Sequence, residues 1–191
     1  MRVLTPSEIR SLLRSIPPRS PFGLRDRAML ILLLHTGLRV SEICGLTIGD
    51  VVQWSVPRKM LDLPGHLGKG GYARLIPLNA SARQAVSQLL GFNQARGFSI
   101  APEAPLLVNR QGQALPVRTF QHLVQRYREA AQLSSRITPH AFRHTMATEL
   151  VQSTGNLRVA QAVLGHARLN TVQVYTHPTP AELARALDTI G

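Results

Sequence analysis

The sequence predicts an α+β fold that is predominantly helical, with one small three-stranded antiparallel sheet. Apolar residues recur at helical spacing through most of the chain, and Thr-Pro helix starts precede several of these segments, as at Thr5 and Thr138. One stretch, from Asp50 to Leu78, instead shows short apolar runs and glycine-rich turns. With 191 residues the chain has the length of one ordinary domain, so we expect a single domain over residues 1–191.

The first helices have standard start and stop signals. The capping box Thr5-Pro6-Ser7-Glu8 opens an amphipathic helix whose apolar residues run from Ile9 to Ile16. A strongly apolar helix follows over Leu24–His35, and Gly37 should end it. We expect this helix to be the centre of the core. Arg39 then stands at the beginning of a brief helix.

The sheet is expected from three short apolar runs, at Val51–Trp54, Met60–Leu63 and Leu75–Leu78. Four glycines between positions 65 and 71 mark the turn that joins the last two runs, and Lys69 lies in that turn. The sequence therefore predicts a hairpin with a lysine near its tip.

Beyond the sheet the pattern returns to helices. The expected segments are helices over Ser81–Ala95 and Val117–Leu133, an extended piece at Leu106–Val108, a helix from Thr138 that Gly155 interrupts, an apolar segment over Val159–Leu164, and a terminal helix over Thr179–Ile190. On the helix that begins at Thr138, His140 and Arg143 are three residues apart and share one face.

The charge of the chain indicates a polyanionic partner. It has 22 Lys and Arg against 10 Asp and Glu, a net charge of +12 with histidines neutral. Charge alone does not separate DNA, RNA and membrane lipid. Cys44 is the only cysteine, which excludes an internal disulfide and favours a reducing cytoplasm. The most apolar run, Ala28–Leu34, is too short to span a bilayer.

Other kinds of site fit the sequence poorly. His140 and His144 have the spacing of metal ligands, but no acidic residue lies between them and Cys44 has no partner. A Gly-x-Ser-x-Gly elbow, a P-loop and a dinucleotide fingerprint are all lacking. We therefore expect no metal and no cofactor.

A phosphate site accounts better for the polar residues. Arg39 and Arg143 can grip a phosphodiester in forked geometry and stabilise the charge of its transition state. A tyrosine hydroxyl titrates near pH 10 and needs a neighbouring base to act as a nucleophile, and Tyr175 with His140 fits this pair. Lys69, on a hairpin tip, can protonate a leaving 5′-oxygen.

These residues occur in five motifs: Thr36-Gly-Leu-Arg-Val-Ser-Glu42, Gly68-Lys-Gly-Gly-Tyr-Ala-Arg74, His140-Ala-Phe-Arg-His144, Leu164-Gly-His166 and Tyr175-Thr-His177. In order and spacing, over nearly the whole chain, they resemble the catalytic domain of tyrosine recombinases of the phage-integrase type. The resemblance implies that Tyr175 forms a 3′-phosphotyrosyl bond and frees a 5′-hydroxyl, without ATP or a metal. A second basic residue, common just after the lysine turn, is missing.

The resemblance also implies roles for the other residues. Arg39 and Arg143 bind the phosphate, His140 assists proton transfer, and Glu42 matches a supporting acidic position. The implied catalytic residues are Arg39, Lys69, His140, Arg143, His166 and Tyr175. His144 and His177 match packing positions rather than catalytic ones.

Most members of the family carry a helical core-binding domain ahead of this one, and here the chain opens at the catalytic domain. We expect either an excised fragment or a naturally short member. The implied partner is double-stranded DNA, bound by a homotetramer in which the helix over Thr179–Ile190 docks into a neighbouring subunit. Packing on its own domain is the alternative for that helix. Accessory proteins and a cytoplasmic, nucleoid-associated location are also expected.

Three alternative functions remain open. A type IB topoisomerase or a telomere resolvase uses a related set of residues. A non-catalytic DNA-binding accessory protein or regulator could keep the same fold. An RNA-binding protein is disfavoured because aromatic residues make up only 5% of the chain. The motifs do not distinguish integration from excision, inversion or resolution.

Overall fold

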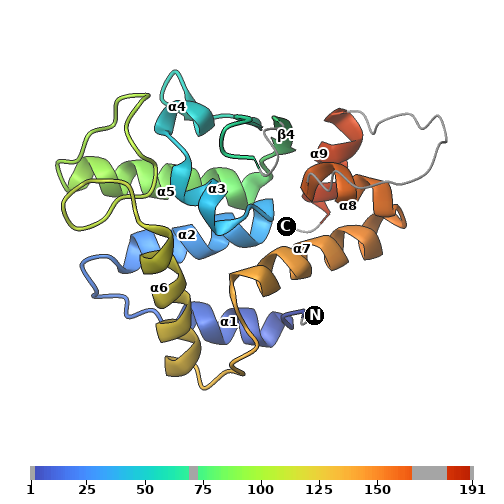
Figure 1. Cartoon of the computed structure of the whole chain (residues 1–191), viewed down its shortest axis with the longest axis horizontal. Helices are drawn as coiled ribbons and strands as arrows, with labels where there is room; N and C mark the ends of the chain where they lie inside the picture. Colours follow the sequence, from blue (N-terminus) through green and yellow to red (C-terminus); the bar gives the residue numbers. More distant parts are fainter. Residues whose placement is uncertain (1–2, 69–72, 165–179, 190–191) are drawn as a thin grey trace.

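The computed structural model describes residues 3–68, 73–164 and 180–189 (Figure 1). In these ranges the helices are α1 Pro6–Arg14, α2 Gly23–Thr36, α3 Val40–Gly45, α4 Ile48–Val51, α5 Ala80–Ala95, α6 Val117–Ala130, α7 Pro139–Thr154, α8 Leu157–Leu164 and α9 Pro180–Asp188. The strands are β1 Val52–Gln53, β2 Val56–Pro57, β3 Met60–Leu63 and β4 Arg74–Pro77. The predominantly helical α+β prediction is confirmed.

Helix α2 forms the centre of the core, as predicted. Met29, Leu30 and Leu33 on this helix are each at most 1% exposed. It packs along α5 and against α7, and it lies across the middle of the molecule (Figure 1). Most residues of α2 are buried, so the helix is packed on several sides along its length.

The three predicted strands do not form one sheet. The described strands make two separate two-stranded antiparallel sheets, β1 with β2 and β3 with β4. The first predicted strand, Val51–Trp54, is not continuous because Val51 is the last residue of the short helix α4. This helix is capped at its start, where the Asp50 carboxylate accepts a hydrogen bond from the Thr47 amide at 2.8 Å. The chain then turns back at Trp54, which has positive φ and is 89% exposed. A run that reverses after two residues cannot serve as an edge strand for β3.

The helix ends mostly agree with the predictions. Thr5 and Glu8 form the capping box of α1, and Gly37 and Gly155 end α2 and α7 in the left-handed region. Helix α6 stops at Ala130, three residues before the predicted end, because Gln132 takes a positive φ of 54° and turns the chain away.

Helix α9 packs on its own chain. Leu183 and Leu187 are 6% and 1% exposed, and the side-chain amide of Asn79 donates to the Leu187 carbonyl at 3.3 Å. Of the expected buried face, Ile190 lies outside the described residues. Over the described ranges, no helix has the length and apolar character needed to cross a bilayer.

Candidate active site

Arg39 is held at the junction between α2 and α3. Gly37 ends α2 with a φ of +60°. A Cβ atom there would lie 2.9 Å from side-chain atoms of Leu164 and Met146, so the conformation and the available space both require glycine. The turn places Arg39 at the N-cap of α3, where a carboxylate oxygen of Glu42 accepts its backbone amide at 2.7 Å.

The carboxylate of Glu42 is fully buried between two arginines. One oxygen accepts Nη1 of Arg39 at 2.7 Å and Nη1 of Arg74 at 3.0 Å, and the other accepts Nη2 of Arg74 at 2.8 Å. Burial alone raises the pKa of Glu42, but the hydrogen bonds from Arg74 and Arg39 outweigh it and hold the pKa below its usual value. The carboxylate is therefore ionised at neutral pH and orients both guanidinium groups.

Arg74 is the residue of this cluster that the sequence analysis missed. Its Nε donates to the Val163 carbonyl at 3.2 Å, so one side chain joins β4, α3 and α8. A signal was present in the sequence: Arg74 shares a face of the strand with buried Ile76, while Leu75 between them is 44% exposed. An arginine on the inner face of a strand needs an acidic partner, and Glu42 is that partner.

Arg143 lies beneath the same junction. It is 8% exposed, its Nη1 donates to the Gly37 carbonyl at 2.5 Å, and its Nη2 donates to the carbonyl of Leu164. Burial, together with the positive charges of Arg39 and Arg74, lowers the pKa of Arg143 to about 10, although the negative charge of Glu42 opposes this shift. The group stays protonated at neutral pH, and the two carbonyl oxygens fix the plane of its guanidinium.

His140 and Arg39 line one hollow of about 490 Å³ between α3, α6 and the start of α7. Gln121, Gln125 and Arg128 of α6 form part of its opposite wall. His140 is exposed and lies in the first turn of α7, where the aligned peptide dipoles add a partial positive charge. The arrangement can bind an anion and place a titratable ring beside it.

The structure brings together the three predicted catalytic residues that it describes. Arg39 and His140 share the hollow, and Arg143 binds the carbonyl two residues before Arg39. The other three, Lys69, His166 and Tyr175, lie outside the described residues. Their catalytic roles stay predictions.

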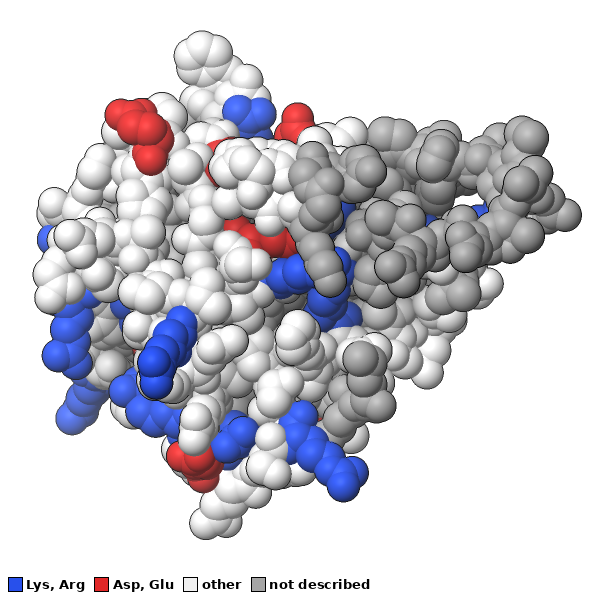
Figure 2. Space-filling view, viewed as in Figure 1, with Lys and Arg blue, Asp and Glu red and all other residues white. Residues whose placement is uncertain are grey.

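Two arginines, Arg39 and Arg128, line the hollow. On the face shown in Figure 2, Lys and Arg gather over the left and lower parts and again near the centre, and Asp and Glu are fewer. Within the described ranges, no group of three or more His, Cys, Asp or Glu side chains is placed to hold a metal ion. The site is thus a positively charged surface built mainly from arginine.

Together these features define a basic, mainly helical domain in which an acidic side chain orders arginines around an anion site. The chain belongs to the phage integrase family, because the sequence profile of that family matches residues 2–182.

Individual relatives agree with this assignment. Tyrosine recombinase XerD of Halalkalibacterium halodurans is 35% identical over 182 residues, which cover 95% of this chain and 59% of that protein. The chain therefore spans less than two thirds of this relative's length.

Two solved structures have the same fold. The XerH site-specific recombinase, solved in a pre-cleavage complex with its difH substrate, is 26% identical with a TM-score of 0.71 over 97% of this chain and 53% of that one. The lambda integrase catalytic core, at 23% identity, has a TM-score of 0.66 over 91% of this chain and 96% of that core. The similarity to the lambda integrase core covers almost all of that core, and at this level of identity it is a similarity of fold alone.

Proposed function

We propose that this chain is the DNA-cleaving domain of a site-specific recombinase that breaks and rejoins strands through a 3′-phosphotyrosyl intermediate. One observation carries the proposal: Glu42 orients Arg39 and Arg74 while Arg143 is fixed on two carbonyl oxygens beside them. Because these guanidinium groups are held in fixed orientations, the cluster would bind a single phosphodiester group in one defined position. The recombinase relatives support strand exchange over relaxation by a topoisomerase or hairpin resolution.

The arginines would hold the reacting phosphate. Glu42 occupies Nη1 of Arg39, whose side chain keeps 22% exposure and lines the hollow. Each terminal nitrogen of Arg143 has a second N–H besides the one given to a carbonyl oxygen. Forked donors of this kind bind two non-bridging oxygens and stabilise the extra negative charge of a pentacoordinate phosphorus.

The covalent step would use the phenol of Tyr175. Its oxygen attacks the phosphorus atom, the bond to the 5′-oxygen breaks, and His140 assists removal of the phenolic proton. Lys69 gives a proton to the departing 5′-oxygen, and His166 donates a hydrogen bond to a phosphate oxygen. The 5′-hydroxyl of a partner duplex then attacks the phosphotyrosine and releases Tyr175, so the number of phosphate ester bonds is conserved and no cofactor is consumed.

Duplex DNA is the proposed partner, and the XerH complex with its DNA substrate supports this choice. We further propose that residues 1–191 work as a catalytic domain within a homotetramer on DNA, with accessory proteins, in the cytoplasm and at the nucleoid. In that assembly Leu183 and Leu187 of α9 would leave their present contacts and pack on a neighbouring subunit.

A trapping experiment tests the reaction without knowledge of the DNA site. The chain is incubated with a pool of DNA duplexes of random sequence. Each duplex carries one nick, and the position of the nick differs from duplex to duplex, so that any cleavage position lies a few nucleotides 5′ of a nick in part of the pool. Cleavage beside a nick releases a short fragment with a 5′-hydroxyl, and the protein stays attached to the 3′-phosphate. Attached DNA survives denaturing gel electrophoresis and is sequenced after protease digestion.

The control variants identify the nucleophile. Tyr175→Phe should abolish the attached species, and Tyr72→Phe, the same change at another tyrosine of the chain, should retain it. Attached DNA in Tyr175→Phe would refute the assigned nucleophile. DNA binding by the wild-type chain with no attached species would point instead to a non-catalytic DNA-binding protein. Relaxed plasmid without recombinant products would point to a topoisomerase.

A further inference from the structure

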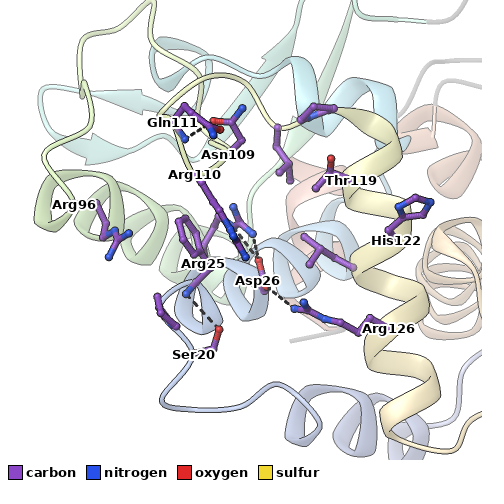
Figure 3. A pocket seen from close by; sticks show the side chains of 15 residues that line it. Ser20, Arg25, Asp26, Arg96, Asn109, Arg110, Gln111, Thr119, His122 and Arg126 are labelled. Atoms are coloured by element: carbon purple, nitrogen blue, oxygen red, sulfur yellow. Dashed lines mark hydrogen bonds and ion pairs between the residues drawn. The ribbon is translucent and has the colours of Figure 1, made fainter.

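A second basic hollow, of about 790 Å³, lies on the other side of α6 (Figure 3). Thr119, His122 and Arg126 of this helix line it, whereas Gln121 and Arg128 line the hollow that contains Arg39. None of its residues belongs to the proposed catalytic set. We call it the Arg110 hollow, after the arginine that reaches into it from the loop before α6.

The floor of the Arg110 hollow is a fixed ion pair at the start of α2. Arg25 and Asp26 are 5% and 1% exposed. Arg25 donates to Oδ1 of Asp26 through Nε at 2.8 Å and Nη2 at 2.6 Å, and its Nη1 donates to the Val108 carbonyl at 2.7 Å. The hydroxyl of Tyr127 donates to Oδ2 of Asp26. The carboxylate is therefore fully engaged by the floor itself.

Around this floor stand three exposed arginines, Arg96, Arg110 and Arg126. Arg126 lies 3.7 Å from Asp26 with a side chain that is 60% exposed. Within the described part of the chain, no carboxylate lies at ion-pair distance from Arg96 or Arg110. Four arginines against one aspartate leave a net charge of +3 with His122 neutral. Like charges gathered in one concavity attract an anion.

The ring of Phe22 packs against Arg25 of the floor and against the exposed Arg96. The guanidinium carbon atoms of Arg25 and Arg96 lie 4.6 and 5.0 Å from the centroid of its ring. Stacking on an aromatic face holds the guanidinium plane of Arg96 and leaves its N–H edge available for a ligand. An ordered N–H fork matches two oxygens of a phosphate group better than a free lysine would.

The position of the Arg110 hollow relates it to the active site. Helix α2 begins at this hollow and ends at Gly37, and positions 25 and 37 are about 18 Å apart along it, since a helix rises 1.5 Å per residue. A DNA duplex rises by about 3.4 Å per base step along its axis, so a duplex of about 30 base pairs is several times longer than 18 Å. A duplex that seats a phosphate at Arg39 and Arg143 extends far enough to reach Arg110.

We infer that the Arg110 hollow binds a backbone phosphate of the same DNA duplex, away from the cleaved position. The inference rests on the proposed function for the placement of the duplex. The contact reads no base, so it anchors and orients DNA of any sequence.

The salt dependence of binding tests this inference. The probe is a random-sequence DNA duplex of about 30 base pairs, and the dissociation constant is measured by fluorescence anisotropy over a range of salt. Each phosphate contact contributes about 0.9 to the slope of log K against log salt. Arg96→Gln/Arg110→Gln removes the single phosphate contact proposed here and should therefore lower the slope by about 0.9. The matched control, Arg10→Gln/Arg14→Gln, removes the same charge from exposed positions of α1 and should leave the slope unchanged.

An unchanged slope in the Arg96/Arg110 variant would overturn the inference, and so would an equal fall in the α1 control. Tighter binding by the wild-type chain to an RNA duplex of the same sequence would rule out DNA as the occupant. Both exchanged arginines are exposed, so the fold should survive, and thermal unfolding checks this. Covalent trapping on the same preparations reports separately on the reaction: attached DNA with an unchanged slope defeats only the inference, and a lowered slope without attached DNA defeats only the proposed function.

Discussion

Both terminal nitrogens of Arg74 donate to the carboxylate of Glu42, at 3.0 and 2.8 Å, although the two residues are 32 positions apart in the chain. The same carboxylate holds Arg39. Arg74 thereby ties the second sheet to the helix junction that carries a proposed phosphate ligand. Stability and activity should both respond when this contact is changed.

Arg74→Gln should lower the free energy of unfolding by about 2–3 kcal/mol. Removing one partner of a buried ion pair leaves a charge without compensation, although Arg39 still neutralises part of Glu42 here. Urea denaturation measures the change. Arg19→Gln, at an exposed position, should change it by less than about 0.5 kcal/mol. Equal losses in the two variants would show that Arg74 has no special role.

The stability that Glu42 provides should depend on pH in the acid range. Its folded-state pKa lies below the ordinary value of 4.5, so its contribution is complete above about pH 4.5 and is lost as the pH falls through the folded-state pKa. The difference in unfolding free energy between the wild type and Glu42→Gln should be constant from neutral pH down to about 4.5 and then shrink. A difference that grows on acidification would contradict the ionised state of Glu42.

Two glycines that end helices provide a matched pair of substitutions. Gly155→Ala should cost about 1 kcal/mol, because it has a φ of +65° but a Cβ there meets nothing within 4 Å. Gly37→Ala should cost about 2–4 kcal/mol, since the new Cβ also collides with Leu164 and Met146. Thermal or urea unfolding of both variants checks the order. Similar costs would mean that the crowding at Gly37 relaxes freely.

Arg143→Lys should slow covalent trapping by about 10²-fold or more, the usual effect of losing one donor to a transition-state oxyanion. An ammonium group keeps the charge but cannot span the carbonyls of Gly37 and Leu164 as a planar fork does. DNA affinity, measured in parallel, should fall much less than the trapping rate. A parallel fall of both would indicate that Arg143 binds DNA without promoting the reaction.

The helices were predictable because their signals are local. These signals act within one or two helical turns, so they can be recognised in the sequence without knowledge of the fold. Examples are the capping box at Thr5, the glycines at positions 37 and 155 and the apolar residues of α2. The two separate sheets were not, because whether Val51 continues as a strand depends on the short helix α4 and on the exposed turn at Trp54.

The sequence by itself determined the mainly helical class, the basic character of the chain and the motifs that contain Arg39, His140 and Arg143, since each depends on residue type and on spacing along the chain. Only the tertiary structure decided that Arg74 completes the Glu42 cluster, that Arg143 spans Gly37 and Leu164, and that Arg96 and Arg110 border a hollow opposite the active site. Those contacts join positions far apart in the chain. Their partners are chosen by packing around α2, which no local pattern encodes.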